Sequence, residues 1–484
     1  MTRRGGNIDA LVALGRSLLG TAAEYAADFL DRSVAHGVSL GITGLSRAGK
    51  TVLTTALAHN LLLPHEAARQ RLPLFRAMQD GRIRATHHLP PRRYAAFPLT
   101  ETLDALCGQE PRWPRPTTGL RELRLAIDYR PRAMLLSRIA ENARLTLDIV
   151  DYPGEWLLDL PLLGGDYAAW SAEIRKLCYA EPRASAAAEW RALWAPLESA
   201  WEKPDDADLR GRACDAYRRF LLRCRDPHGL TYLQPGRFLQ PGDDFDESRY
   251  RFCPAPPGVS AGWERGGSLG AAMRQGFDSY RENVVVPFYR DHFARLRRQI
   301  VLVDVFSALR SGPAAFEDSR LSLSRVLDNF RYGNGVLERL LGRGRIDRAI
   351  FVATKSDHIA RSQFLNLSAL LRAMTMGAST TAEARGADVE FEIAAALKST
   401  LHAVRRLDGQ PHDVLVGVPM GERKARGVMP GILPDHLPLP SDWGDGNFGF
   451  VEFEPPSLAS ARDNGFDNIH LGLLLQHALG DLFR

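Results

Sequence analysis

Hydrophobic and polar positions recur with two different periods along the 484-residue chain. Short apolar runs at 37–44, 299–309 and 348–357 are typical of buried strands. The segments 120–129 and 144–151 alternate as strands do and predict a two-strand unit, for which an antiparallel pairing is one option. A period near 3.6 residues predicts helices over 8–34, over 50–62 and over the closing segment 469–483.

The pattern changes in the middle of the chain, where tryptophans and leucines are spaced for helix packing. We predict an N-terminal helix (1–36), a first part of an α/β domain (37–164), a helical insertion (165–298) and a second part with a C-terminal extension (299–484). Residues 64–118 show little periodicity, 389–400 predict a strand that runs into a helix, and a strand is expected near Phe448–Phe453. The strand–helix alternation predicts a mostly parallel sheet with helices on both faces.

Composition restricts the class of protein. Hydrophobic content of 45% and charged content of 25% are usual for a soluble globular chain. The sequence has no run of 18 apolar residues, so no transmembrane helix is expected. Five scattered cysteines without a CxxC pair indicate reduced thiols and a cytoplasmic protein. The net charge of +5 fits either an arginine-rich background or an acidic membrane surface, and without a nucleic-acid motif we expect no nucleic acid partner.

The first candidate site is the turn after the 37–44 strand, which matches G-x4-G-K-[ST] from Gly44 to Thr51. Glycines let the backbone wrap closely around phosphate, and the following helix adds its positive end. The expected phosphate-binding residues are Gly44, Ser46, Arg47, Ala48, Gly49, Lys50, Thr51 and Val52. Lys50 would place its charge between the β- and γ-phosphates, and the Thr51 hydroxyl would bind Mg²⁺.

A second motif, Asp151-x-x-Gly154, follows the 144–151 strand. Open α/β sheets bind ligands at the carboxyl ends of their strands, so Asp151 is placed to hold Mg²⁺, usually through a water. The Gly154 N–H could sense a γ-phosphate. Two further D-x-x-G matches, 208–211 and 226–229, lie in the predicted helical insertion, away from any strand end.

The third motif concerns the base. Thr354-Lys355-Ser-Asp357 ends another predicted strand. Asp357 could accept hydrogen bonds from N1–H and the amino group of guanine, whereas adenine offers neither donor. Charge-assisted bonds of about 1.5–3 kcal/mol each would favour guanine, and the Lys355 stem would cover the base.

In this order the three motifs resemble those of the TRAFAC-class, Ras-like GTPase fold, a P-loop NTPase fold. The resemblance implies GTP or GDP with Mg²⁺ as ligands. It also implies a threonine that closes over the metal, for which Thr117 and Thr118 are candidates and Thr118 is preferred. A last base-binding turn is expected at Ala395, Ala396 and Leu397, although a serine is missing there.

The wider plan, including "DYPGEW" and "VGVPMGERKARGVMPGILPDHLP", resembles the YcjX-like family of bacterial stress-associated P-loop proteins over nearly the whole chain. The resemblance implies a role in a stress response and a small inner-membrane partner protein. The chain would then be cytoplasmic or peripheral to the inner membrane, and its oligomeric state stays open.

One departure from the Ras-like pattern bears on catalysis. Glu155 stands where a glutamine usually orients the attacking water, so hydrolysis should be slow. The catalytic candidates are Lys50, Thr118, Gly154, Glu155 and Arg47; Arg47 either donates charge to the transition state or faces solvent. We expect a slow GTPase switch that rearranges 64–118 and 155–165. The alternative is an ATP-binding NTPase or a nucleotide-stabilised scaffold with little hydrolysis.

Overall fold

The structure is a computed structural model that describes residues 36–131, 143–243, 245–260, 265–328, 346–384, 386–444 and 448–483. The helix predicted over 8–34 lies outside the described residues. Within them, the central feature is an eight-stranded sheet with the order β2-β4-β5-β1-β6-β7-β8, in which β3 pairs with β4. Its strands are β1 (His36–Gly44), β2 (Ile83–Leu89), β3 (Ala95–Ala96), β4 (Arg121–Tyr129), β5 (Ala143–Asp151), β6 (Arg298–Val303), β7 (Arg348–Ala353) and β8 (Asp388–Ile393).

The sheet is mostly parallel. Strand β1 pairs in parallel with β5 and β6, and the parallel ladder continues through β7 to β8. Strands β4 and β5 form the antiparallel pair that the alternation in 120–151 suggested, and β2 adds a further antiparallel edge. The predicted α/β class is therefore confirmed, and the carboxyl ends of β1, β5, β6 and β7 share one edge of the sheet.

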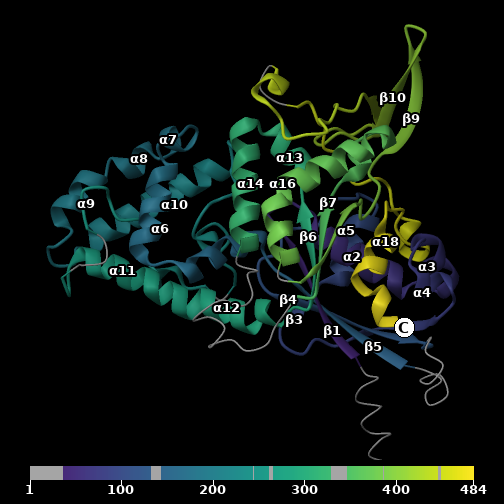
Figure 1. The fold of residues 1–484 in the computed structure, drawn as a ribbon, viewed down its shortest axis with the longest axis horizontal. Coiled ribbons are helices and arrows are strands. Elements are labelled where there is room, and N and C mark those ends of the chain that lie inside the picture. The colour runs from purple at the N-terminus through teal and green to yellow at the C-terminus, as the bar shows by residue number, and fades with distance from the viewer. Residues whose placement is uncertain are drawn as a thin grey trace, which may run out of the picture.

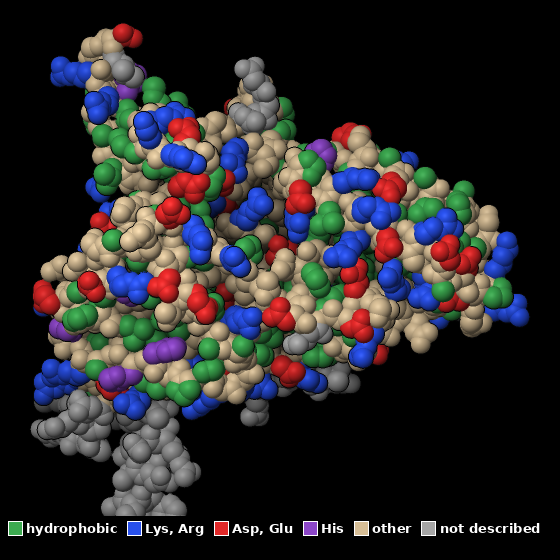
Figure 2. Space-filling view, turned by 180° about the vertical axis from the view of Figure 1, so that it is seen from behind, with side chains coloured by type: hydrophobic (Ala, Val, Ile, Leu, Met, Phe, Trp, Pro, Cys, Tyr) green, Lys and Arg blue, Asp and Glu red, His purple; other side chains and the backbone are tan. Residues whose placement is uncertain are grey.

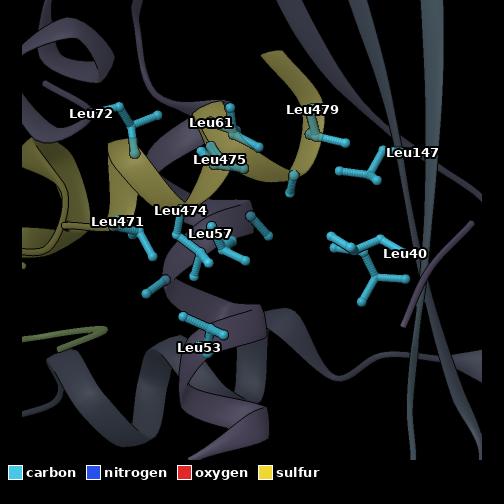
Figure 3. Packing of buried hydrophobic residues seen from close by; sticks show 14 of the residues in the cluster. Leu40, Leu53, Leu57, Leu61, Leu72, Leu147, Leu471, Leu474, Leu475 and Leu479 are labelled. Atoms are coloured by element: carbon cyan, nitrogen blue, oxygen red, sulfur yellow. The ribbon is translucent and has the colours of Figure 1, made fainter. Parts of the chain in front are cut away.

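Helices cover both faces of the sheet (Figure 1). On one face, α2 (Lys50–Leu62) packs against α18 (Leu471–Leu479), and the two helices share a leucine-rich core with the strands (Figure 3). Leu57 and Leu474 lie close together there, and Leu40 of β1 belongs to the same buried cluster. On the other face lie η1 (Gly154–Gly164), α13 (Val305–Arg310), α14 (Pro313–Asp328) and α16 (Phe364–Ala384). The closing helix thus anchors the C-terminal end to the helix that follows the first glycine-rich turn.

Between β5 and β6 the chain forms a helical lobe, seen at the left of Figure 1. Its buried aromatic core is distinct from the two cores on the sheet and includes Trp170, Trp190, Trp194 and Trp201. Its elements are α6 (Tyr167–Leu177), α7 (Arg183–Ala186), α8 (Ala188–Arg191), α9 (Trp194–Ala200), α10 (Ala207–Arg225), η2 (Gly236–Phe238), η3 (Glu247–Arg249), α11 (Leu269–Tyr280), η4 (Arg281–Val285), α12 (Val286–Asp291) and η5 (Phe293–Arg295). The boundaries 165 and 298 stay predictions.

The region 64–118 contains more regular structure than its weak periodicity suggested. Besides β2 and β3 it forms α3 (His65–Arg71), α4 (Arg76–Gln79) and α5 (Leu99–Cys107). These helices are short, so few turns are available to reveal a period.

Two predictions near the C-terminus are wrong. Strand β8 ends at Ile393 and is followed by a loop, not by a helix, because Ala395 exchanges backbone hydrogen bonds with Ile469. The segment Phe448–Phe453 forms no strand. Phe450 and Phe453 are buried and Phe448 is partly buried, and within the segment only Phe453 makes an isolated bridge, to Pro419. A three-stranded sheet of β9 (Leu401–Leu407), β10 (Gln410–Gly417) and β11 (Arg426–Val428) was not predicted. Its β9–β10 hairpin extends away from the body in Figure 1.

The remaining short helices in this half are η6 (Ser356–His358), η7 (Arg361–Gln363), η8 (Pro440–Trp443), α17 (Ala461–Asn464) and η9 (Gly480–Phe483). Among the described helices, none has the length and apolar character needed to cross a bilayer. Figure 2 shows Lys and Arg side chains interspersed with Asp and Glu over the face drawn there, without a single large basic patch.

Candidate functional site

The three motifs meet in one cavity of about 820 Å³ at the carboxyl edge of the sheet. The turn after β1, the loop after β5 and the loop after β7 all open into it. Of the residues predicted from the sequence, the lining includes Ser46, Arg47, Ala48, Gly49, Lys50, Thr51, Val52, Gly154, Glu155, Thr354, Lys355, Asp357, Ala395, Ala396 and Leu397. Gly44, Thr118 and Asp151 are not part of that lining.

The turn between β1 and α2 contains two residues in the left-handed region of backbone conformation. Gly49 has φ 89°, a left-handed conformation, and Arg47 has φ 64° with an exposed side chain. The Lys50 ammonium is buried and donates to the backbone oxygens of Gly44 at 2.9 Å and Leu45 at 3.2 Å. Burial lowers the pKa of Lys50, which the charges of Asp151 and Glu155 oppose. A phosphate here would supply the counter-charge that this buried cation requires.

Three side-chain oxygens form a compact cluster behind the turn. Thr117 donates to Asp151 Oδ2 at 2.5 Å, Thr51 donates to the same oxygen at 3.2 Å, and the two threonine hydroxyls are 3.0 Å apart. Asp151 Oδ1 is buried and has no hydrogen-bond partner among the described residues. Burial raises the pKa of Asp151, while the Thr117 bond and the Lys50 charge act against that rise. Hydroxyl and carboxylate oxygens suit Mg²⁺, so the cluster fits this ion.

The preferred threonine of the sequence analysis is corrected by this geometry. Thr117 reaches Thr51 and Asp151, whereas the Thr118 side chain is exposed. Neighbouring residues in this extended segment point in different directions, so only one of the two hydroxyls can face the carboxylate. Thr117 therefore takes the place expected for Thr118.

Gly154 lies directly against the phosphate-binding turn. A Cβ built on Gly154 would lie 2.6 Å from the Leu45 carbonyl carbon and 2.7 Å from Lys50 Nζ. No side chain fits there without moving the turn. The next residue, Glu155, lines the cavity and is half-buried. The loop after β5 is thus in contact with the turn after β1.

The Asp357 carboxylate is fixed by a residue outside its own motif. Ser399 donates to Asp357 Oδ2 from its backbone N–H at 2.7 Å and from its hydroxyl at 2.6 Å. Asp357 is only 6% exposed, yet it lines the cavity. An aspartate held in this way can present its remaining acceptor capacity to a ligand.

Lys355 is held in the left-handed region, at φ 58°. Its ammonium lies 2.6 Å from Asp304 Oδ2 and 3.5 Å from Glu452 Oε1. Burial alone would lower the pKa of Lys355, but Asp304 and Glu452 together raise it above its usual value. The stem of Lys355 is therefore fixed at the wall of the cavity.

The loop 394–400 supplies fewer free donors than the sequence suggested. The Ala395 N–H is already bonded to the Ile469 oxygen at 3.1 Å. Ala396 and Leu397 also line the cavity. Any backbone contact to a ligand from this loop would therefore come from these two residues and not from Ala395.

Comparison with known proteins agrees with this arrangement. The family model described as "YcjX-like family, DUF463" matches residues 38–483. The "Ras-like GTPase YcjX" of Escherichia coli (strain K12) is 35% identical over 464 residues, covering 94% of this chain and 98% of the relative. A protein of the same name from Shewanella oneidensis is 34% identical over 473 residues, covering 93% and 96%. The chain belongs to the YcjX-like family.

In this YcjX-like chain the helical lobe is hydrogen-bonded to the segment that follows Gly154. Gln234 Nε2 donates to the Leu158 oxygen at 2.6 Å, and Trp156 Nε1 donates to the Gln240 oxygen at 2.7 Å. Asp159 accepts from the Gly236 N–H at 2.7 Å and, from α11, the Tyr280 hydroxyl at 2.6 Å.

The same loop of the lobe also reaches the segment that carries Thr117. Asp243 forms an ion pair with Arg121 at 3.2 Å. A Cβ on Gly242 would lie 2.8 Å from the Trp156 ring and 3.1 Å from the Thr118 oxygen. Residues 234–243 therefore contact both segments that flank the cluster of Thr51, Thr117 and Asp151.

Three residues of the site were missed by sequence reasoning. Asp304 directly follows β6, but 299–309 was interpreted as one strand, so its position at a strand end was hidden. Ser399 was overlooked because the serine was sought within 395–397. Glu452 belongs to a loop of the C-terminal extension and carries no local motif.

Proposed function

We propose that this chain binds guanine nucleotide with Mg²⁺ and hydrolyses GTP slowly, as a nucleotide-controlled switch. One observation carries the proposal: Asp357, oriented by Ser399, lines the same cavity as the turn that holds Lys50. A base acceptor and a phosphate-binding turn that line one cavity are what a purine nucleotide needs, and the carboxylate favours guanine. The printed name "Ras-like GTPase" of the two relatives supports the same activity.

The metal would be held by Thr51 and Thr117, with Asp151 either direct or through a water. Bound Mg²⁺ would neutralise charge on the phosphates. The chain itself positions the nucleotide through the backbone N–H groups of 46–52 and the buried Lys50 charge. Gly154 lies close enough to the turn for its N–H to respond to a third phosphate.

Slow turnover follows from the residue after Gly154. Glu155 lines the cavity, but a carboxylate near a γ-phosphate is repelled by it and is a poor positioner of water there. Arg47 lines the cavity and is exposed. It could therefore donate charge to the transition state or simply face solvent, and the hydrolysis rate of an Arg47 variant would distinguish the two roles.

The segments that we expect to rearrange with the nucleotide are 64–118 and 155–165. The lobe loop 234–243 contacts both, at Thr118 and at Trp156. A nucleotide-dependent shift of either segment would therefore change the contacts that Gln234, Gly236 and Gly242 of the helical lobe make with it. This contact supports the lobe as the element that reports the nucleotide state. The stress response and the inner-membrane partner protein belong to the same proposal and would be tested by partner capture with the two nucleotide states.

The experiment that tests the proposed function is competition of GTP, GDP and ATP for the purified protein with Mg²⁺. We expect GTP and GDP to displace a fluorescent guanine nucleotide at least a hundredfold more effectively than ATP. Preference for ATP would instead support the alternative of an ATP-binding NTPase or scaffold. Tight GTP binding without turnover over hours would support a nucleotide-stabilised scaffold.

A further inference from the structure

A second cavity, of about 250 Å³, lies on the sheet away from the nucleotide cavity. Its lining comes from β1, β4 and β5, from residues 92–94 and from residues 291–297. None of its lining residues belongs to the nucleotide cavity. The two cavities are nevertheless close, because Tyr152 lines the first and its ring lies 5.0 Å from the ring of His292, which lines the second.

Four arginines surround the opening of this second cavity. Arg92, Arg93, Arg295 and Arg297 are exposed, and none forms an ion pair with a described acidic residue. Arginine guanidinium groups at one opening repel each other unless an anion lies between them. They also match phosphate oxygens in a two-point geometry.

The acidic side chains of the lining neutralise these arginines only in part. Glu122 Oε2 accepts from the backbone N–H groups of Arg92 at 2.7 Å and Arg93 at 2.8 Å. Asp148 accepts from the buried Arg124 at 2.8 Å, and Asp291 pairs with Arg290 at 2.8 Å. Asp291 also interacts electrostatically with Arg93 and Arg295, and Glu122 keeps its charge because its donors are backbone groups. Since Asp148 and Asp291 each pair with a further arginine, the positive charge still exceeds the negative charge at the opening.

His292 also lines the cavity, but its side chain is buried. His292 is 4% exposed, and its Nε2 has no hydrogen-bond partner among the described residues. Burial lowers the pKa of His292 to about 3, so the imidazole is neutral and Nε2 can donate when protonated as the N–H tautomer. Because this nitrogen is also closed off from the open volume of the cavity, the donors for a ligand come from the arginines and not from His292.

We propose that the second cavity binds a small polyanion of the phosphate or phosphate-monoester class. The four arginines would pair with its oxygens. The volume lies below the roughly 300 Å³ at which cavities begin to hold drug-sized ligands, so a group of phosphate to pyrophosphate size fits, whereas a whole nucleotide does not.

The test uses inorganic pyrophosphate as the probe, titrated calorimetrically without Mg²⁺. Because pyrophosphate could also enter the turn at Lys50, the titration is made in the Lys50→Met variant, which isolates the second cavity. Arg93→Gln/Arg295→Gln removes two charges at its opening. The matched control, Arg212→Gln/Arg249→Gln, removes two exposed charges from the helical lobe.

We expect one pyrophosphate to bind Lys50→Met protein, a loss of affinity of at least tenfold in Arg93→Gln/Arg295→Gln, and a change within twofold in the control. Equal losses in both double variants would show a general charge effect and overturn the proposal. Absence of binding in the Lys50→Met background would overturn it as well. A failure of GDP to bind the wild type would contradict only the nucleotide proposal and leave this result standing.

Discussion

Thr117 donates a 2.5 Å hydrogen bond to Asp151 Oδ2, which ties the loop before β4 to the end of β5. The Thr51 hydroxyl, at the start of α2, lies 3.0 Å from that of Thr117. Three separate segments of the chain thus place oxygens at one point. Because a hard cation would use the same oxygens, metal binding and the position of the 113–121 segment should be coupled.

The adjacent threonines offer a matched test of this cluster. We expect Thr117→Ala to weaken binding of GTP with Mg²⁺ by about tenfold, or ~1.4 kcal/mol, because one metal-facing oxygen is lost. Thr118→Ala should change the affinity by less than twofold, since its side chain is exposed. The measurement is GTP-analogue affinity with and without Mg²⁺. The reverse ranking would contradict the assignment of Thr117.

Lys50→Met should separate folding from nucleotide binding. In the nucleotide-free protein the Lys50 ammonium is buried with carbonyl partners, and burial lowers its pKa. Removing this charge should therefore leave the melting temperature equal or higher. For the wild type, a nucleotide at a hundred times its Kd adds about 2.7 kcal/mol to the free energy of unfolding. In the Lys50→Met variant this stabilisation should vanish. The exposed control Lys176→Met should keep it. Full GDP stabilisation of Lys50→Met protein would remove Lys50 from the site.

Gly236→Ala should disturb the contact between the helical lobe and the segment after Gly154. A Cβ on Gly236 would lie 1.8 Å from the Glu155 oxygen, so the two backbones must separate. We expect a loss of about 1–3 kcal/mol in the free energy of unfolding and an altered rate of GTP hydrolysis.

Gly211→Ala is the control, because its Cβ in α10 meets only Arg251 at 4.0 Å. This change should stabilise the protein by about 0.5–1 kcal/mol, the usual gain of alanine over glycine inside a helix. If Gly236→Ala and Gly211→Ala changed the free energy of unfolding by the same amount, the proposed close contact between the lobe and the Glu155 backbone would be wrong.

Asp159 gives a pH dependence with a defined sign. Burial raises the pKa of Asp159 to about 6, against hydrogen bonds from Tyr280 and Gly236 and the charge of Arg237. The folded state therefore holds the proton more tightly than the unfolded state. Protonation of Asp159 therefore stabilises the folded state. This contribution to the free energy of unfolding is fully present below about pH 4 and is lost as the pH rises to about 6.

Asp159→Asn should abolish that contribution, because the amide does not titrate. In a comparison of denaturant unfolding between pH 4 and 7, the difference in stability between variant and wild type should grow with pH, by at most about 3 kcal/mol. A constant difference across this range would contradict the raised pKa.

The parallel core was predictable because its strands are continuous apolar runs and its first turn has a full motif. The hairpin β9–β10 was not, since most of β9 is exposed, β10 is buried only in its second half, and the two strands include Arg405, Arg406 and Pro411. The alanine-rich segment after Ile393 has helix propensity, but tertiary hydrogen bonds to Ile469 override it.

In the candidate site, too, residues that belong to a local sequence pattern were predicted, and residues placed by tertiary contacts were not. Residues within contiguous motifs, such as Lys50 and Asp357, were predicted from motif spacing and strand ends, and both line the cavity. Ser399, Asp304 and Glu452 reach the cavity through the packing of distant loops, and no local pattern marks them. The choice between Thr117 and Thr118 required the direction of a side chain, which sequence spacing in an irregular segment does not provide.

The most direct test of the central claim is the nucleotide preference of Asp357→Asn. Both Ser399 donors need an acceptor, so the asparagine oxygen should turn toward Ser399 and leave its NH₂ group toward the base. That group would face the N–H donors of guanine but could donate to the 2-carbonyl of xanthine. Competitive binding of GDP, XDP and ADP to wild type and variant measures this. We predict that GDP affinity falls by at least a hundredfold, about 2.7 kcal/mol, and that XDP becomes the preferred ligand. GDP affinity within twofold of the wild type, or a wild type that prefers ADP, would contradict guanine recognition by Asp357.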